Sequence, residues 1–298
     1  MSSKYIVGSE TIKKFLSSLQ CNSKNEHNNK YPKISIITPS YNQAKFLERT
    51  IISVLNQNYP NLEYIIIDGG STDGSVEIIK KYEKYLYYWV SEPDKGQTDA
   101  LNKGLKISSG DILAFQNSDD IYLPDTFKTI SRNFLLNPEV GVVYGDFLHI
   151  DENDNILDIQ LLIKAHYWMQ VFKGPQIHNQ SAFWARWTYN KVGDFNEKYQ
   201  FDMDYDFFSR ILLYKIPSIH VKKFLGAFRH HHDSKTSTIN QISKIEYRDV
   251  SQKYKSMRLT TKFVPYSIGK NFGTIYKSFV HIKDRRMDYL LRDRLKFK

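Results

Sequence analysis

Acidic and amide side chains gather at two places where an apolar run of strand length ends. Asp68 closes the run at 64–67. Later in the chain, Asn117, Ser118 and Asp119 follow a second such run. In an open α/β sheet, ligands bind at the carboxyl ends of the strands. Oxygen ligands placed there suit a divalent cation that bridges a diphosphate. The pattern therefore predicts a nucleoside diphosphate site with a metal ion.

Alternating strands and helices must position these residues. Runs of strand length lie at 34–38, 64–67, 87–90 and 112–115, and amphipathic helical segments lie between them at 44–56, 75–82 and 98–107. Strands that alternate with helices of this length predict a parallel sheet with helices on both faces. Beyond residue 120 the alternation loosens, and the pattern predicts a helix at 124–136, a strand at 140–150 and a helix at 205–214.

Length and composition set broad limits. The chain has 298 residues, 41% hydrophobic and 25% charged, which indicates a folded protein with one large α/β domain and an appendage. The apolar runs are far shorter than the ~20 residues that cross a bilayer, and no secretion signal opens the chain. The single cysteine, Cys21, excludes an internal disulfide and fits a reducing compartment. We therefore expect a cytoplasmic protein.

The net charge of +10 is concentrated in the last part of the chain. Residues 241–298 contain fifteen Lys and Arg but five Asp and Glu, so residues 1–240 are close to neutral. A basic tail on a neutral body indicates an anionic partner for the tail: lipid headgroups, nucleic acid or another protein. We divide the chain into an N-terminal extension at 1–30, an α/β domain at 31–240 and a basic helical extension at 241–298.

Several motifs in a consistent order resemble glycosyltransferase family 2. They lie at 36–42, 67–74, 92–96 and 110–120, and the resemblance covers residues 33–237. It implies a GT-A fold, which is a Rossmann-like mixed, mostly parallel sheet flanked by helices. It also implies an inverting enzyme that takes a sugar from a nucleotide-diphosphate donor.

The resemblance assigns the donor site to loops that follow the strands. Asp68 would accept the imide N–H of uracil or thymine, so UDP or dTDP is the expected nucleotide; a turn aspartate is the alternative. The other residues that would contact the donor are Thr38, Pro39, Tyr41, Asn42, Lys95, Gly96, Asp99, Asn117 and Ser118. Structural alternatives stay open for three of them: a helix N-cap for Asn42, a solvated lysine for Lys95 and a first-turn acid for Asp99.

Asp119 is the expected ligand of Mn²⁺ or Mg²⁺. The cation would neutralise the leaving nucleoside diphosphate. Asn117 stands where the family's Asp-x-Asp motif has its first carboxylate, and the lost charge predicts a weaker or donor-dependent metal site. His231, within three consecutive histidines, is expected to approach the metal or phosphate. Asp120 would either orient the loop or touch the metal.

Asp204 resembles the family's general base, which removes the proton of the acceptor hydroxyl as that hydroxyl attacks. Asp202 is the rival candidate, and Asp206 is expected to support the structure. The alternative is that all three aspartates complement a helix N-terminus.

The acceptor-side segment of the family resembles residues His178, Gln180 and Trp184 of this chain. Trp184 or Trp187 would stack on a sugar, and a buried aromatic residue is the alternative. The acceptor is expected to be a glycan or a lipid-linked glycan in surface polysaccharide biosynthesis.

The basic extension has three interpretations. Apolar residues at helical spacing with many Lys and Arg are typical of an interfacial membrane helix, which would place the enzyme at the inner face of the plasma membrane. The alternatives are packing on the α/β domain and a homodimer contact. A GT-A-like protein that binds nucleotide or glycan without turnover is the competing function. No nucleic-acid recognition motif is present, so no nucleic acid partner is expected.

Overall fold

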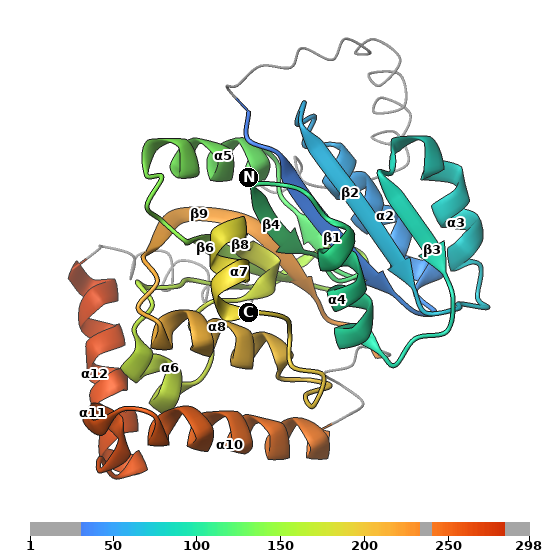
Figure 1. The fold of residues 1–298 in the computed structure, drawn as a ribbon. Coiled ribbons are helices and arrows are strands. Elements are labelled where there is room, and N and C mark those ends of the chain that lie inside the picture. The colour runs from blue at the N-terminus through green and yellow to red at the C-terminus, as the bar shows by residue number, and fades with distance from the viewer. Residues whose placement is uncertain (1–30, 233–239, 284–298) are drawn as a thin grey trace.

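The computed structural model describes residues 31–232 and 240–283, and in them nine strands form one mixed sheet (Figure 1). The strands are β1 (Ile34–Ser40), β2 (Leu62–Asp68), β3 (Tyr88–Ser91), β4 (Ile112–Phe115), β5 (Ile121–Tyr122), β6 (Val142–Ile150), β7 (Ile156–Gln160), β8 (Ala182–Ala185) and β9 (Ser218–Arg229). The helices are α2 (Ala44–Leu55), α3 (Ser75–Tyr82), α4 (Gln97–Ile107), α5 (Thr126–Leu136), α6 (Tyr167–Lys173), α7 (Arg186–Val192), α8 (Met203–Leu213), α10 (Asn240–Ser256), α11 (Leu259–Lys262) and α12 (Tyr266–Lys283).

The sheet has a parallel half and a mixed half. Its strand order is β3-β2-β1-β4-β8-β6-β9-β5, with β7 paired to β6. Strands β3, β2, β1 and β4 are parallel, so their carboxyl ends share one edge. Strand β8 is antiparallel to β4 and β6, whereas β6 and β9 are parallel. The expected α/β fold with a mostly parallel, mixed sheet is confirmed.

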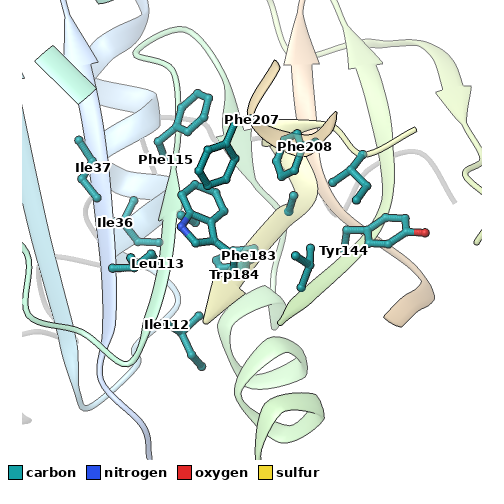
Figure 2. Close-up of a cluster of buried hydrophobic side chains, with 14 of the residues drawn as sticks. Ile36, Ile37, Ile112, Leu113, Phe115, Tyr144, Phe183, Trp184, Phe207 and Phe208 are labelled. Carbon is teal, nitrogen blue, oxygen red and sulfur yellow. The ribbon is translucent and has the colours of Figure 1, made fainter. Parts of the chain in front are cut away.

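Strand β8 joins the two halves because it pairs with β4 on one side and with β6 on the other. Its side chains alternate between the two faces of the sheet. Phe183 packs against Phe127 of α5, with ring centroids 5.8 Å apart. Trp184 points the other way and packs against Phe207 and Phe208 of α8 (Figure 2). The core thus continues from the parallel half into the mixed half without a break.

The predicted elements before residue 120 are confirmed with small shifts of their ends. Strands β5, β7, β8 and β9 and helices α6 and α7 were not predicted. In β9, two consecutive lysines at 222–223 and shifts of register against β6 interrupt the alternation that identifies a strand. Helix α8 begins at Met203, so it includes the candidate base that the prediction had placed before the helix.

Helix α10 of the basic extension packs on the α/β domain, along α8 and α6 (Figure 1). Its Val250 and Tyr254 are fully buried in the main core. Helix α12 lies against α6 through Gly269 and Gly273, where an added Cβ would meet Phe172 or Lys173. The predicted extension at 1–30, with Cys21, lies outside the described residues, as do 233–239 and 284–298. None of the helices in the described part combines the length and the hydrophobicity that crossing a bilayer requires.

Candidate active site

Asp68 is fully buried at the carboxyl end of β2. Its carboxylate accepts hydrogen bonds from the backbone N–H groups of Gly70 (3.2 Å) and Ser71 (2.8 Å). The hydroxyls of Ser71 (2.6 Å) and Ser91 (2.7 Å) also donate to it. Gly70 has a φ of +82°, a conformation that glycine adopts without strain. Asp68 therefore holds its own turn together, and its contact with a base stays a prediction.

The loops after β1 and β2 are joined by hydrogen bonds at the shared sheet edge. Asn42 donates its backbone N–H to Ser71 Oγ (2.8 Å), and its side-chain oxygen accepts the N–H of Thr72 (2.9 Å). Asp73 accepts the N–H of Ala44 at the start of α2 (2.8 Å) and that of Ser75 at the start of α3 (3.0 Å). Asp73 thus caps two helices, and Asn42 clamps the neighbouring loop and caps neither helix.

The other predicted residues of the first loop differ in exposure. Thr38 is fully buried, with its hydroxyl 3.1 Å from that of Tyr64, so its side chain belongs to the core. Pro39 is also buried within β1. Tyr41 is 62% exposed, so its side chain, unlike those of Thr38 and Pro39, faces solvent where a ligand could contact it.

The loop before α4 is ordered by two aspartates. Asp94 accepts the N–H of Gly96 (2.7 Å), and Asp99 accepts the N–H of Lys95 (3.1 Å). The bond from Lys95 and the nearby charge of Lys103 lower the pKa of Asp99. Asp99 therefore holds this loop from the first turn of α4, and its contact with the donor stays a prediction; Lys95 and Gly96 are exposed at the edge.

Asp120 organises the loop that follows β4. Its carboxylate is fully buried and accepts from the Nδ2 of Asn117 (3.2 Å), the Nε2 of Gln180 (3.0 Å) and the N–H of Arg229 (2.9 Å). Burial and the charge of Asp119 raise the pKa of Asp120 well above its usual range. Of the two predicted roles of Asp120, the geometry favours orienting the loop.

The second turn of α2 supports the same loop. Thr50 donates to the carbonyl oxygens of Ser118 (2.9 Å) and Asp120 (2.7 Å). Ser118 is itself buried. The contact that the sequence assigned to Ser118 would therefore have to come from its backbone.

Asp119 and His231, which the sequence assigned to the metal, meet in the structure. Asp119 Oδ2 lies 3.0 Å from His231 Nε2. The Asp119 side chain is 20% exposed, and the His231 side chain is buried against Phe46, with ring centroids 4.4 Å apart. The fully buried Arg229 donates its Nε to the Asp119 carbonyl (2.7 Å). Sequence reasoning gave no role to Arg229, because nothing in the sequence marks an arginine as buried.

The donor set fits a cation that a diphosphate helps to hold. Among the described residues, no three His, Cys, Asp or Glu side chains form a group that could bind a metal ion by themselves. Mg²⁺ is commonly bound by one or two carboxylates, with substrate phosphates and water completing its shell. Asp119 supplies one such carboxylate, and the imidazole of His231 lies beside it. The amide oxygen of Asn117 accepts from Gln97 Nε2 (2.7 Å), so it is already bonded within the protein.

Helix α4 brings the candidate base to this site. Thr98 donates to the Tyr199 carbonyl (2.9 Å), and its Oγ1 lies 2.9 Å from the Met203 sulfur at the start of α8. The preceding residue, Gln97, bonds to Asn117. Adjacent residues of α4 therefore contact the loop after β4 and the helix that carries Asp204.

The three aspartates around the start of α8 have different surroundings. Asp206 is buried and contacts Lys253 Nζ (2.7 Å) and the Tyr254 hydroxyl (2.9 Å), in agreement with a structural role. Burial, with smaller contributions from the charges of Asp204 and Glu246, raises the pKa of Asp202 to about 7. Asp204 is half-buried in the first turn of α8.

The acceptor-side predictions need one correction. Trp184 is fully buried between β4 and α8, so its ring has no free face for a sugar and it is a core residue (Figure 2). Trp187, the alternative, is 39% exposed. Gln180 is buried and bonded to Asp120, so it supports the donor-side loop. Burial lowers the pKa of His178 to about 4, which keeps its ring neutral beside Phe147.

Sequence comparisons identify relatives of this chain. Residues 35–202 match the family described as Glycosyl transferase family 2. Over 180 residues the chain is 32% identical to an uncharacterised glycosyltransferase of Haemophilus influenzae, and the match covers 59% of this chain and 70% of that protein. It is 41% identical over 100 residues to TuaG of Bacillus subtilis, whose name assigns it to teichuronic acid biosynthesis. That match covers 33% of this chain and 40% of TuaG, so the chain spans less than half of some curated relatives.

Solved structures share the fold. Staphylococcus aureus TarS in complex with UDP-GlcNAc has a TM-score of 0.63 and 18% identity, over 80% of this chain and 69% of that chain. The mannosyltransferase PcManGT of Pyrobaculum calidifontis, in complex with GDP-Man and Mn²⁺, has a TM-score of 0.55 and 18% identity, over 81% and 70%. This likeness confirms the GT-A architecture that the sequence predicts.

Proposed function

Because the chain belongs to glycosyltransferase family 2 and is a transferase, we propose that it moves a sugar from a nucleotide diphosphate to a glycan hydroxyl with inversion. UDP and dTDP sugars are the proposed donors. The relatives support this proposal: TarS was crystallised with UDP-GlcNAc, and TuaG is named for teichuronic acid biosynthesis. The acceptor is a growing surface glycan.

The observation that carries the proposal is the contact of α4 with both halves of the site. Gln97 bonds to Asn117 beside the proposed metal ligand, and Thr98 bonds to Tyr199 beside the proposed base. A donor at the carboxyl edge of the parallel strands would therefore lie next to the start of α8. Inverting transfer needs this arrangement, because the base acts opposite the leaving group.

In the proposed mechanism each residue has one task. Asp204 accepts the proton of the acceptor hydroxyl as its oxygen attacks the anomeric carbon, and the bond to the diphosphate breaks. Asp119 and His231 would hold Mn²⁺ or Mg²⁺, which when bound neutralises charge on the diphosphate. Asp68 accepts the imide N–H of the base. Asp120 keeps Asp119 in place through the loop that it orients.

Thermal stability against UDP, dTDP and GDP sugars, with and without Mn²⁺, tests the donor half of the proposal. A ligand present at a hundred times its dissociation constant stabilises the protein by about 2.7 kcal/mol. We expect a metal-dependent shift with a UDP or dTDP sugar, and its loss in Asp119→Ala. A shift only with GDP sugars would contradict the assigned nucleotide, and no shift with any donor would favour a degenerate donor site or one that binds only together with the acceptor.

We also propose that the acceptor is lipid-linked and that the basic extension contacts an anionic membrane. Helix α12 turns one face to α6 and leaves an apolar face exposed. Its residues are each 48% to 68% exposed and follow helical spacing: Ile268, Phe272, Ile275 and Phe279. Leu259 and Phe263 near α11 are also exposed. Such a face within the basic part of the chain is typical of an interfacial helix.

Sedimentation with anionic vesicles tests this contact in the full chain. The double variant Ile275→Glu with Phe279→Glu should abolish pelleting, because it places charge on the face that would enter the lipid. The control is Leu136→Glu on α5, which is 68% exposed at another surface. Pelleting by the double variant would contradict the membrane contact. If the wild type does not bind vesicles but forms dimers, and if these dimers dissociate in the double variant, the exposed face of α12 would be a contact with a second copy of the chain.

A further inference from the structure

One face of α10 holds the segment that carries the candidate base. The residues that contact this segment recur every three or four positions, which places them on one side of a helix: Glu246, Asp249, Lys253 and Tyr254. Lys253 and Tyr254 bond to Asp206 in the first turns of α8. Asp249 bonds to the side chains of Lys198 and Tyr199. Contacts from α10 therefore run from residue 198 to residue 206.

Glu246 makes the contacts nearest to the start of α8. Its Oε1 accepts the backbone N–H of Gln200 (2.9 Å), and its Oε2 accepts those of Phe201 (2.8 Å) and Asp202 (3.0 Å). Three consecutive N–H groups thus point at one carboxylate. The Glu246 residue is 8% exposed, so water competes little for these bonds.

These bonds lie at the start of α8, where backbone N–H groups need partners from outside the helix. The first N–H groups of a helix have no partner within the helix, and Asp202, the N-cap of α8, makes no side-chain capping bond. Glu246 accepts one of these N–H groups, that of Asp202, while those of Gln200 and Phe201 lie just before the helix. Hydrogen bonds to an ionised group are roughly twice as strong as neutral ones, so Glu246 restricts the backbone two residues before Asp204.

We propose that Glu246 is a positioning residue, which sets the backbone of residues 200–202 and thereby the direction in which Asp204 meets the acceptor hydroxyl. This inference rests on the proposed function, since it concerns the base of that reaction. It makes α10 part of the catalytic unit, although the sequence assigns this helix to a separate basic extension.

The test compares Glu246→Gln with Glu139→Gln in the full chain. Glutamine keeps the shape of the side chain but turns an amide NH₂ toward a backbone N–H, so part of the cluster is lost. We expect kcat to fall about tenfold or more, because small displacements of a catalytic group are costly, while KM for the donor stays within about twofold of the wild-type value. Glu139 is exposed in the loop after α5, so the same exchange of side chains there should keep the wild-type kcat.

Backbone hydrogen exchange supplies the second measurement, and it does not depend on turnover. In Glu246→Gln, the amides of residues 200–202 should exchange faster, while those of β1 and β2 keep their rates. If Glu246→Gln does not fold, Glu246→Asp is measured by the same two criteria. Wild-type kcat in the folded variant, or unchanged exchange at 200–202, would overturn the inference. If the wild-type protein transfers no sugar, the proposed function fails, and the exchange rates still decide whether Glu246 holds this segment.

Discussion

The donor side and the base side of the site are held together in different ways. On the donor side, loops that follow parallel strands bond to the neighbouring loop: Asn42 clamps Thr72, and Asp73 caps α2 and α3 together. On the base side, the segment around Asp204 is held by α10, a helix from another part of the chain. The donor loops after β1 and β2 are thus organised by their own turns, whereas the base side, like the loop after β4, is held by contacts with distant segments.

This difference indicates which parts of the site depend on contacts with the rest of the fold. A substitution in the loops after β1 and β2 removes one of several bonds between neighbouring loops and should act mainly on ligand binding. A substitution at the base side acts on a helix start whose position is set from outside, so it should act on turnover. The four predictions below test that division, in order of decreasing expected effect.

The largest effect is expected at the base. Asp204→Asn should lower kcat about a thousandfold, because general base catalysis contributes roughly 10² to 10⁴, and the stabilisation by a UDP sugar should be retained. Initial rates and thermal shifts of the same samples measure both. Asp202→Asn is the matched control, since it removes a carboxylate two residues away. An equal or larger loss of kcat in Asp202→Asn would transfer the role to Asp202.

On the donor side, Asp119→Asn should lower kcat/KM about a hundredfold, which is the usual cost of losing one electrostatic contact to developing charge. The loss should be accompanied by weaker dependence on Mn²⁺, and titration of the metal against initial rate measures it. Asn117→Asp is the opposite change. It restores a carboxylate beside Asp119 and should lower the Mn²⁺ concentration needed for half-maximal rate. Unchanged metal dependence in both variants would remove the metal from this loop.

A smaller effect concerns stability against pH on the base side. Burial, with the charges of Asp204 and Glu246, raises the pKa of Asp202 to about 7, above its unfolded value near 4. The folded protein then binds a proton that the unfolded chain does not, so stability falls as pH rises from about 4 to about 7, by at most about 1.4 kcal/mol per pH unit. Urea unfolding at several pH values should show a flatter profile in Asp202→Asn. A parallel profile in the variant would contradict the assignment.

The sequence predicted the donor side better for a physical reason. Strand ends in a parallel sheet meet at one edge, so residues such as Asp68 and Asp119 could be placed from the pattern of strands alone. The assignment of Asp119 and His231 to the metal came from the family resemblance; the structure shows the two side chains in contact, and the metal site stays a prediction.

Burial and long-range contacts could not be predicted in this way. Trp184 and Trp187 are alike in the sequence, yet the strand position of Trp184 buries it and the helix position of Trp187 exposes it. Arg229 and Glu246 are charged residues that a sequence pattern places at the surface. Their partners are mainly backbone groups of distant segments, which leave no signature in the sequence.

The smallest effect is expected at the loop clamp of the donor side. Asn42 has a φ of +50°, a left-handed conformation that costs alanine about 1 to 2 kcal/mol and glycine little. Asn42→Ala should therefore be less stable than Asn42→Gly by about 1 kcal/mol in urea unfolding, although both lose the bond to Thr72. Equal stabilities would mean that the loop relaxes and that the clamp is not rigid.

The same pair of variants separates the clamp from a direct donor contact. If Asn42 touches the ribose, both variants should raise the KM for the donor alike, because both lack the amide. If Asn42 acts only as a clamp, the KM should follow the strain, and Asn42→Ala should be affected more than Asn42→Gly. We expect the second pattern, because the donor loop depends on its own turn. A wild-type KM in both variants would show that donor binding does not depend on the bond between Asn42 and Thr72.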